Sequence, residues 1–491
     1  MIIRGRRFIM SGTNPPDPGK NIKIEVTFSG NPLNPMVSFA AAKYNKEVVF
    51  NYEQDDSQEG IYEVVFKHFY GGTAFDGVTS PGLKHTDGCG NQLNWKAAAA
   101  CFAVNRYGVD LMDGVNSYVN YDQIYEMLQA DWDVLNHQFG APSSNIAGDS
   151  DRYQQIRDLS QRVWERMLSR GMEYRIRGMV NPAADPGYTF SGFNTKIRVF
   201  SSQGGTEDLK DGYPFHNDKK LNTLQLPDVA MTREYLGENF KADLISEWSG
   251  LINQVKTSGT KAAPSLLRLF SHGPYKESDS AAGFRTFMNY VAAELGDRVW
   301  AGTTTELFEY LETKSLADKK ETLEGNKLTV NIDLSAIPDE NRRRDMSLLI
   351  SGGQITDIAV TGADHYSYNP ATGLVNVFKK KTTKFLAPIT DQEPPRFIAA
   401  TYNSASPNRI MLKFNMAVSQ SLKGGYTITG GSGYTVNMLT GSGDTWYLNL
   451  NKAVAGSLSI EYRGQDGDVK AVDSSNQLRG TSIIGYPVQM G

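Results

Sequence analysis

The feature that most constrains the fold of this chain is a change in the period of its apolar residues near Gly325. Upstream, over residues 22–320, short apolar runs alternate with segments in which apolar residues recur every three to four positions. Downstream, the stretch LTVNIDL at 328–334 alternates strictly between apolar and polar residues. The first pattern predicts strands and helices in a parallel sheet or a βα barrel, and the second predicts half-buried strands.

The upstream pattern can be assigned element by element. Strands are predicted at 46–52, 134–135, 174–180, 196–200, 266–270 and 297–302. Helices are predicted at 121–130, 153–170, 284–295 and 305–312. We therefore expect one α/β domain that covers residues 22–322.

The downstream part predicts two β-sandwich modules, one at 323–388 and one at 389–491, joined by the Pro-rich linker PITDQEPP. Strands are expected at 348–350, 355–360, 374–378, 397–402, 410–414, 426–428, 446–450 and 458–462. Short strands separated by Gly, Asn and Ser clusters are typical of an immunoglobulin-like sandwich. The stretch PPRFIAATYNSASPNRIMLKFNMAV of the last module also resembles bacterial Ig-like repeats.

Composition and charge narrow the partners and the compartment. The net charge is −4 and no long basic run is present, which argues against nucleic acid as a partner. No stretch of eighteen apolar residues is present, so no transmembrane segment is predicted. Residues 1–21 lack the apolar core of an intact signal peptide, and SGTNPPDPGK is typical of a polar tether. The tether and the sandwich modules together predict an extracytoplasmic protein, periplasmic, secreted or at the cell surface.

Titratable residues that directly follow predicted strands are the candidates for chemistry, because active residues of βα folds lie where strands end and loops begin. Asp55 and Asp56 follow the first strand (VVFNYEQDD). His137 follows a later strand (DVLNHQFG), and His272 follows a late one (LLRLFSHGP). We expect these four side chains to converge on one pocket at one rim of the sheet.

This ordered set resembles the polysaccharide deacetylases of the carbohydrate-esterase kind, as does the closing segment DRVWAGTTTELFEYLET. The resemblance covers about residues 40–315 and implies a distorted (β/α) barrel with a divalent metal, namely zinc, cobalt or nickel. It implies that Asp55 is the catalytic base and that Asp56 binds the metal. It further implies that His137 is the first histidine ligand and that His272 is the general acid.

The sequence departs from the family pattern at the metal site. The second histidine ligand of the family falls at Ala141, which cannot bind metal. The first motif, normally Thr-Phe-Asp-Asp-Gly, is Glu-Gln-Asp-Asp-Ser here, and Asn181-Pro182 stands where the Arg-containing third motif is expected. Because catalytic zinc sites usually supply three protein ligands, a third ligand must come from elsewhere or the metal is absent.

The stretch HTDGCG contains candidates for that third ligand. His85, Asp87 and Cys89 occupy alternate positions, which would point the same way on an extended segment, so His85 and Asp87 are possible additional ligands. The alternative is a tight turn with a structural aspartate. His216 (YPFHND) is a weaker candidate. The cysteines, Cys89 and Cys101, either form one disulfide or stay thiols.

The resemblance implies a metal-dependent carbohydrate deacetylase that hydrolyses N- or O-acetyl groups of a polysaccharide. A metal would lower the pKa of the attacking water, a carboxylate would take its proton, and a histidine would protonate the leaving group. The missing second histidine supports an alternative, a catalytically lapsed deacetylase-fold protein that binds glycan at the cell surface. A structural surface protein is a third reading. The sequence contains no Gly-x-Ser-x-Gly elbow, P-loop or His-Glu-x-x-His, while a glycosidase carboxylate pair stays open.

Overall fold

The chain contains three folded parts, described here one at a time. The structure is a computed structural model. It describes residues 20–104, 109–140, 152–182, 188, 192, 195, 197–201, 233–238, 240, 243–380, 395–462, 467–472 and 483–491. One compact unit consists of Met1–Asn45, Thr86–Asn91 and Glu309–Thr383. The other consists of Lys46–His85, Gln92–Phe308 and Lys384–Gly491, which hold an α/β part and a C-terminal β module.

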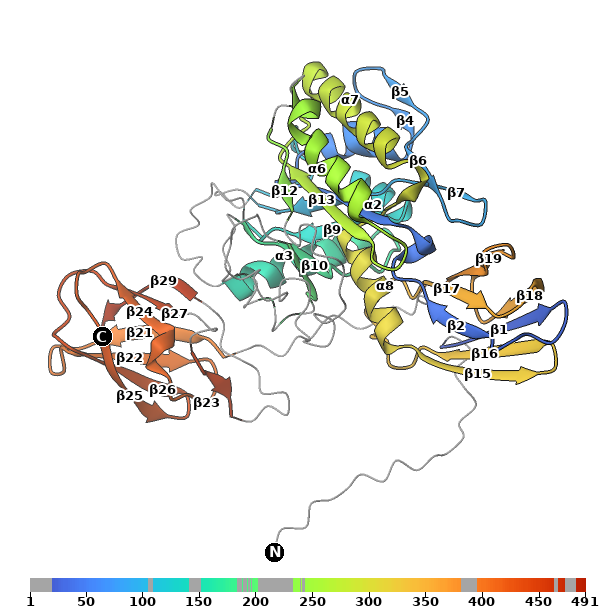
Figure 1. The fold of residues 1–491 in the computed structure, drawn as a ribbon. Coiled ribbons are helices and arrows are strands. Elements are labelled where there is room, and N and C mark those ends of the chain that lie inside the picture. The colour runs from blue at the N-terminus through green and yellow to red at the C-terminus, as the bar shows by residue number, and fades with distance from the viewer. Residues whose placement is uncertain are drawn as a thin grey trace, which may run out of the picture. The chain divides into compact units, whose positions relative to one another are not determined.

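The α/β part is built on one eight-stranded parallel sheet (Figure 1). Its spatial order is β11-β10-β9-β8-β3-β13-β12, and β14 pairs with β3 beside β8. The strands are β3 (Val48–Gln54), β8 (Ala98–Cys101), β9 (Asp133–Asn136), β10 (Gly178–Val180), β11 (Val199–Ser201), β12 (Glu234–Tyr235), β13 (Ser265–Ser271) and β14 (Val299–Ala301). Every described pairing in this sheet is parallel, which confirms the predicted α/β barrel architecture.

The central strands form because their sequences suit burial on both faces. All seven residues of β3 (VVFNYEQ) and all seven of β13 (SLLRLFS) are buried. Parallel strands covered on both sides read as nearly continuous apolar runs, and these two fit that pattern apart from a few polar residues. The polar exceptions, Asn51, Glu53 and Arg268 among them, lie inside the sheet and need internal partners.

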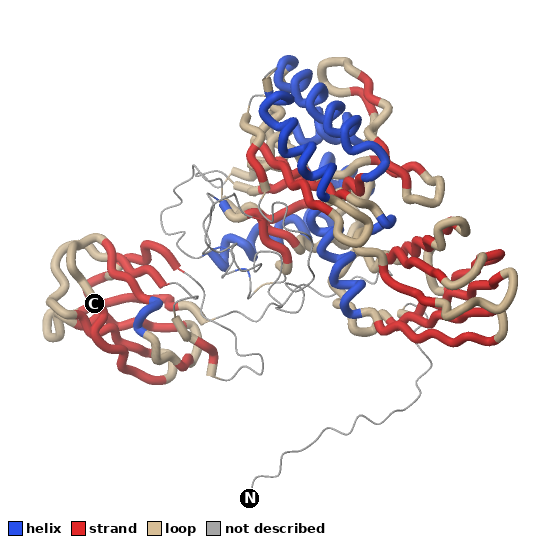
Figure 2. The backbone as a smooth tube through the Cα atoms, viewed as in Figure 1, coloured by secondary structure: helices blue, strands red, loops and turns tan. Residues whose placement is uncertain are grey.

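Helices cover this sheet, as the blue segments around the red strands of Figure 2 show. They are α2 (Tyr121–Gln129), α3 (Arg152–Leu168), α6 (Leu244–Ser258), α7 (Ser278–Leu295) and α8 (Thr304–Leu316), with the short η2 (Ile61–Phe66), α1 (Lys67–Phe69) and η6 (Gly296–Arg298). The start of α2 is fixed by a capping box between Asn120 and Gln123. Two small hairpins lie in the same region of the chain: β4 (Gly72–Thr73) with β5 (Thr79–Ser80), and β6 (Lys84–Thr86) with β7 (Gln92–Asn94).

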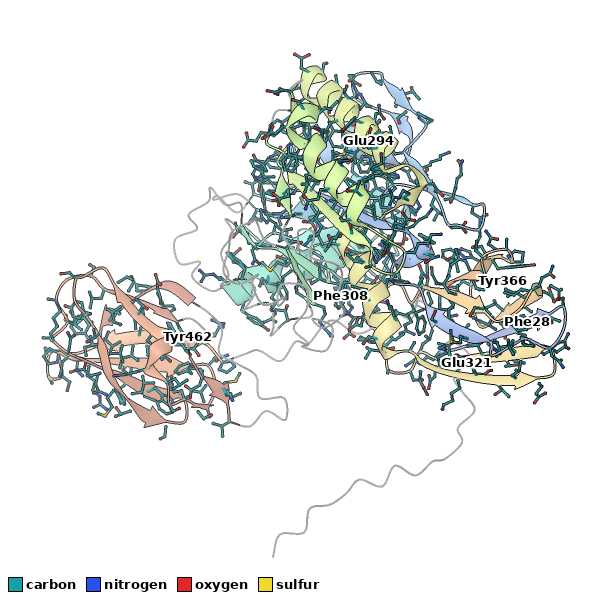
Figure 3. All side chains as sticks on the ribbon, in the orientation of Figure 1. Phe28, Glu294, Phe308, Glu321, Tyr366 and Tyr462 are labelled. Atoms are coloured by element: carbon teal, nitrogen blue, oxygen red, sulfur yellow. The ribbon has the colours of Figure 1, made fainter. Side chains whose placement is uncertain are left out.

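The first compact unit is a β-sandwich of two four-stranded sheets that share one apolar core. One sheet has the order β15-β16-β1-β18 and the other β19-β20-β17-β2. The strands are β1 (Asn21–Phe28), β2 (Met36–Phe39), β15 (Asp318–Glu324), β16 (Lys327–Asp333), β17 (Met346–Ser351), β18 (Ile355–Thr361), β19 (His365–Asn369) and β20 (Leu374–Phe378), with η1 (Lys43–Asn45) after β2. Phe28, labelled in Figure 3, is one of the buried side chains between the sheets.

The boundary that we predicted at 322/323 differs from the boundary in the structure. Residues 22–39, which we placed in the barrel, supply β1 and β2 of this sandwich, and β1 pairs with β16 and β18. The physical reason is the alternation in NIKIEVTF, where Ile22, Ile24, Val26 and Phe28 are buried and the residues between them are not. That period belongs to a half-buried antiparallel strand rather than to a doubly covered parallel one.

The C-terminal module is a second β-sandwich with its own core. Its larger sheet has the order β25-β26-β22-β21-β30, and smaller sheets are β24-β27-β29 and β23-β28. The elements are β21 (Phe397–Tyr402), β22 (Arg409–Phe414), β23 (Val418–Ser419), η7 (Lys423–Gly425), β24 (Tyr426–Thr429), β25 (Val436–Ser442), β26 (Thr445–Leu450), β27 (Ser459–Tyr462), β28 (Lys470–Ala471), β29 (Ile483–Pro487) and β30 (Gln489–Met490). The predicted sandwich is confirmed, and its immunoglobulin-like type stays a prediction.

Two further sequence predictions concern the termini and the cysteines. Among the described residues, no helix is long and apolar enough to cross a membrane. The predicted tether at 1–21 lies almost wholly outside the described residues, which begin at Lys20. Both cysteines are free thiols, so the single disulfide that the sequence left open is not formed.

Candidate functional site

The four strand-end residues singled out in the sequence come together at the carboxyl edge of the parallel sheet. Asp55 and Asp56 follow β3, His137 follows β9 and His272 follows β13. The carboxylate of Asp56 lies between the two imidazoles. Its Oδ1 is 3.3 Å from His137 Nε2, and its Oδ2 is 3.8 Å from His272 Nε2.

The backbone after β3 adopts an unusual conformation that aims Asp56 across the sheet edge. Asp56 and Ser57 have φ values of 66° and 53°, in the left-handed region that non-glycine residues rarely adopt. Ser57 is held by its neighbours: its N–H donates to Ala100 O at 3.2 Å, and its hydroxyl donates to Phe102 O at 2.9 Å. Strained residues of this kind persist where surrounding contacts fix them, and they cluster at functional sites.

One ring nitrogen of His137 is held by a backbone carbonyl, which is the usual arrangement for a histidine that binds metal through its other nitrogen. Its Nδ1 is 3.1 Å from Val180 O, so the Nδ1–H donates to that carbonyl and Nε2 faces Asp56. With metal–ligand bonds of 2.0–2.1 Å, two ligand atoms of a tetrahedral site lie about 3.3 Å apart. The separation of 3.3 Å between His137 Nε2 and Asp56 Oδ1 matches that value, so these two donors fit one shared metal.

Asp56 and His137 shift each other's pKa toward the charged form. Burial alone would raise the pKa of Asp56, but the interaction with His137, aided by His272 and Arg233, outweighs burial and lowers that pKa. Burial alone would lower the pKa of His137, but the neighbouring Asp56 and Asp55 outweigh it and raise that pKa. Each group therefore favours the charged form of the other, and because histidine binds metal in its neutral form, metal and proton compete for Nε2.

A third protein ligand is not evident in the described part of the chain. No group of three His, Cys, Asp or Glu side chains that could hold a metal occurs among the described residues. Ala141, where the second histidine was expected, and His216 lie outside them. The donor set seen here therefore consists of Asp56 and His137.

Asp87 is engaged in a turn rather than aimed at a metal. Its carboxylate accepts hydrogen bonds from Cys89 N at 2.8 Å, Asn91 N at 3.0 Å, Asn91 Nδ2 at 2.8 Å and Ser367 Oγ at 2.6 Å. Gly88 and Gly90, at φ values of 74° and 105°, make the turn. His85 is buried in the strand before it, and Asp87 is assigned to the other compact unit. The geometry matches the alternative interpretation, a tight turn with a structural aspartate.

Asp55 is held by an arginine that the sequence reasoning missed. Arg233 Nη1 and Nη2 donate to Asp55 Oδ1 and Oδ2, both at 2.6 Å, in a bidentate pair with both side chains buried. The guanidinium also lies over the ring of Phe270, 3.9 Å from its centroid. Arg233 directly precedes β12, 178 positions after Asp55 in the chain. No local pattern marks it, because the sequence analysis predicted no strand at β12.

His272 also has partners that sequence reasoning did not identify. Its Nδ1 is 3.0 Å from the hydroxyl of Tyr235 and 3.7 Å from Glu238 Oε1. Burial and the nearby Glu238 carboxylate raise the pKa of Tyr235 to about 12, so its hydroxyl keeps its proton at neutral pH. These contacts fix the imidazole from the side opposite Asp56 and give a protonated ring a nearby negative charge.

Comparisons with solved structures find similar chains at low sequence identity. No protein-family model and no curated protein sequence matches the chain. Among solved structures, the chitin deacetylase from the fungal pathogen Colletotrichum lindemuthianum is 12% identical, with a TM-score of 0.31 over 55% of this chain and 89% of that one. The Xyl-CE4 domain of a multidomain xylanase from the hindgut metagenome of Trinervitermes trinervoides is 12% identical, with a TM-score of 0.26 over 54% and 90%. This chain is similar to CE4 deacetylases.

A third neighbour is a CE4 family pseudoenzyme from Bacillus anthracis, 12% identical, with a TM-score of 0.23 over 54% of this chain and 66% of that one. Active and lapsed members are both among the structural neighbours.

Proposed function

We propose that the chain is a metal-dependent carbohydrate deacetylase that hydrolyses N- or O-acetyl groups of a polysaccharide. The observation that carries the proposal is the convergence of Asp55, Asp56, His137 and His272 from three strand ends, with ligand-like spacing between Asp56 and His137. The shifted pKa values of Asp56 and His137, which lie together at this edge, are typical of active-site residues.

Each residue has a role in the proposed reaction. Asp56 and His137 would hold a divalent zinc, cobalt or nickel ion, which supplies Lewis acidity and lowers the pKa of a bound water. Asp55, oriented by Arg233, would take the proton from the attacking water. Each oxygen of Asp55 accepts one bond from Arg233, which leaves lone pairs for that proton. His272 would protonate the departing amine or alkoxide, and Tyr235 keeps its ring in place.

Metal analysis tests the binding half of the proposal. Purified protein is loaded with zinc, cobalt or nickel at pH 8, where protons compete least for His137, and bound metal is measured per chain. We expect about one ion in wild type, and loss of it in Asp56→Ala and His137→Ala. His365→Ala, a histidine of the sandwich, is the matched control and should keep the metal. Equal metal content in all four proteins would contradict the ligand assignment.

Acetate release tests the catalytic half. Acetylated sugar oligomers, carrying either N- or O-acetyl groups, are incubated with wild type and with Asp55→Asn, which keeps the shape of the side chain. Loss of a general base is expected to lower kcat by a factor of about 10²–10⁴. If wild type and Asp55→Asn release equal acetate, the base assignment is wrong.

A second function is favoured by the small number of metal ligands. Alanine stands at position 141, and among the described residues no group of three possible ligands occurs. A catalytically lapsed protein of this fold would bind glycan at the cell surface without hydrolysing it. Metal-free protein that releases no acetate but retains binding of the same oligomers in calorimetry would favour this function. We propose an extracytoplasmic location for either function, because both act on polysaccharide.

A further inference from the structure

A buried, charge-balanced network adjoins the base candidate inside the barrel. Glu53 lies on β3, and Asp55 directly follows that strand. Because the two residues are two positions apart, their side chains face the same side of the sheet. Glu53, Asp55, Arg233 and Arg268 are each 1% exposed. Two carboxylates and two guanidinium groups thus balance one another's charge away from solvent, so the removal of any one of them leaves a buried charge without its partner.

Glu53 is the centre of this network. Its Oε1 accepts hydrogen bonds from Arg268 Nη2 at 3.0 Å, from Ser201 Oγ at 3.1 Å and from the hydroxyl of Thr304. Its Oε2 accepts from Arg233 Nη1 at 3.2 Å. Burial would raise the pKa of Glu53, but Arg268 and Arg233 outweigh it and lower that pKa, so the carboxylate is charged.

The contacts of Arg233 connect Glu53 to the proposed base. Arg233 Nη1 donates to Glu53 Oε2 and to Asp55 Oδ1, while Nη2 donates to Asp55 Oδ2. A guanidinium on a flexible stem can rotate about a single carboxylate, and a second carboxylate at a fixed position removes that freedom. Glu53 is itself fixed by groups from β11, β13 and the first turn of α8.

We propose that Glu53 is a positioning residue, which fixes the Arg233 fork and thereby the orientation of the Asp55 carboxylate. The inference rests on the proposed function only for the role of Asp55 as base. The competing explanation is that Glu53 serves solely to neutralise Arg268. The two explanations predict different behaviour when the Glu53–Arg268 pair is removed as a whole.

The double variant Glu53→Met/Arg268→Met separates them, because it removes one negative and one positive charge and leaves Asp55 balanced by Arg233. Replacing a buried ion pair by apolar groups of similar volume is often neutral for stability. We expect the double variant to unfold near the wild-type midpoint and to bind metal as wild type does. We expect its kcat to fall about ten- to hundredfold with KM unchanged, because the base is misplaced while the binding surface is intact.

The matched control is Asp76→Leu/Arg285→Met, which removes another largely buried ion pair of the α/β part, 2.6 Å in length. It should leave kcat unchanged. A crystal structure of each protein gives a readout independent of activity: the two distances between Arg233 and Asp55. We expect both to be near 2.6 Å in wild type and in the control, as in this structure, and at least one to be lost in Glu53→Met/Arg268→Met.

Wild-type kcat in the double variant, or an intact fork in its crystal structure, would overturn the proposal. If the double variant does not fold, Glu53→Gln keeps the volume, removes the charge and is judged by the same two distances and the same kcat. If wild type itself releases no acetate, the deacetylase function fails, and the crystal structures still decide whether Glu53 positions Arg233.

Discussion

Removal of Arg233 tests whether the buried charges near the site are balanced as the structure indicates. Arg233→Met leaves the carboxylates of Asp55 and Glu53 with Arg268 alone, so one buried negative charge loses its partner. Breaking a buried pair by removing one member costs about 3–5 kcal/mol. That is a large part of the 5–15 kcal/mol by which a domain of ordinary stability is folded.

A second substitution should recover most of that loss. In Arg233→Met/Asp55→Asn the uncompensated carboxylate is gone, and Glu53 stays paired with Arg268 at 3.0 Å. We expect this double variant to lie within about 1 kcal/mol of wild type, because a buried pair can be replaced by neutral groups at little cost. The double variant should therefore be more stable than Arg233→Met alone by about 2–4 kcal/mol, which shows that the two residues are strongly coupled.

Urea unfolding followed by tryptophan fluorescence measures these free energies in the intact chain. Trp95, Trp132 and Trp300 are buried in the α/β part and report on its unfolding. Arg298→Met is the control, since Arg298 pairs with Glu47 but its side chain is 39% exposed, and exposed pairs contribute about 0–1 kcal/mol. A cost below 1 kcal/mol for Arg233→Met, or a further loss on adding Asp55→Asn, would refute the charge-balance reasoning.

Two further substitutions test other parts of the α/β fold. Burial, with the charge of Arg285, lowers the pKa of His68 to about 4, so the ring is neutral in the folded protein. The free energy of unfolding should therefore be highest above pH 6.5 and should fall by about 3 kcal/mol as the pH drops to 4, because the unfolded chain takes up a proton at His68 and the folded protein does not. His68→Phe should abolish this fall in urea titrations at pH 7.5, 5.5 and 4.5. If the unfolding free energies of wild type and variant change in parallel with pH, the assignment is wrong. Gly60→Ala places a Cβ 1.6 Å from Pro274 O, just after His272, and should cost about 1–3 kcal/mol in thermal unfolding and lower kcat; an unchanged melting temperature would contradict the clash.

The barrel strands and the strand-end residues could be predicted from the sequence because their signals are local. The apolar runs of β3 and β13 and the polar residues that follow them are adjacent in the chain. Parallel topology then brings the carboxyl ends of the strands to one edge, which is why Asp56, His137 and His272 meet. The prediction needed no knowledge of which strands are neighbours.

Pairings over long sequence distances could not be predicted in the same way. β1 pairs with β16, about 300 residues downstream. The alternation of NIKIEVTF predicts a half-buried strand, but it does not predict which strand pairs with it. Arg233 and Glu53 are likewise joined only by the fold. At Asp87 the sequence left two interpretations open, and the glycines at 88 and 90, with their positive φ values, form the tight turn that was one of them.

The backbone of β8 explains how Asp56 and His137 meet although their strands are not neighbours. β8 lies between β3 and β9, so the parent strands are about 10 Å apart. Its carbonyl oxygens hold the chain on both sides: Ala100 O accepts from Ser57 N at 3.2 Å, and Cys101 O accepts from His137 N at 2.8 Å. Asp56, next to Ser57, has a left-handed backbone, and its carboxylate lies 3.3 Å from His137 Nε2. The end of β8 therefore anchors the two backbone segments whose side chains form the proposed metal pair.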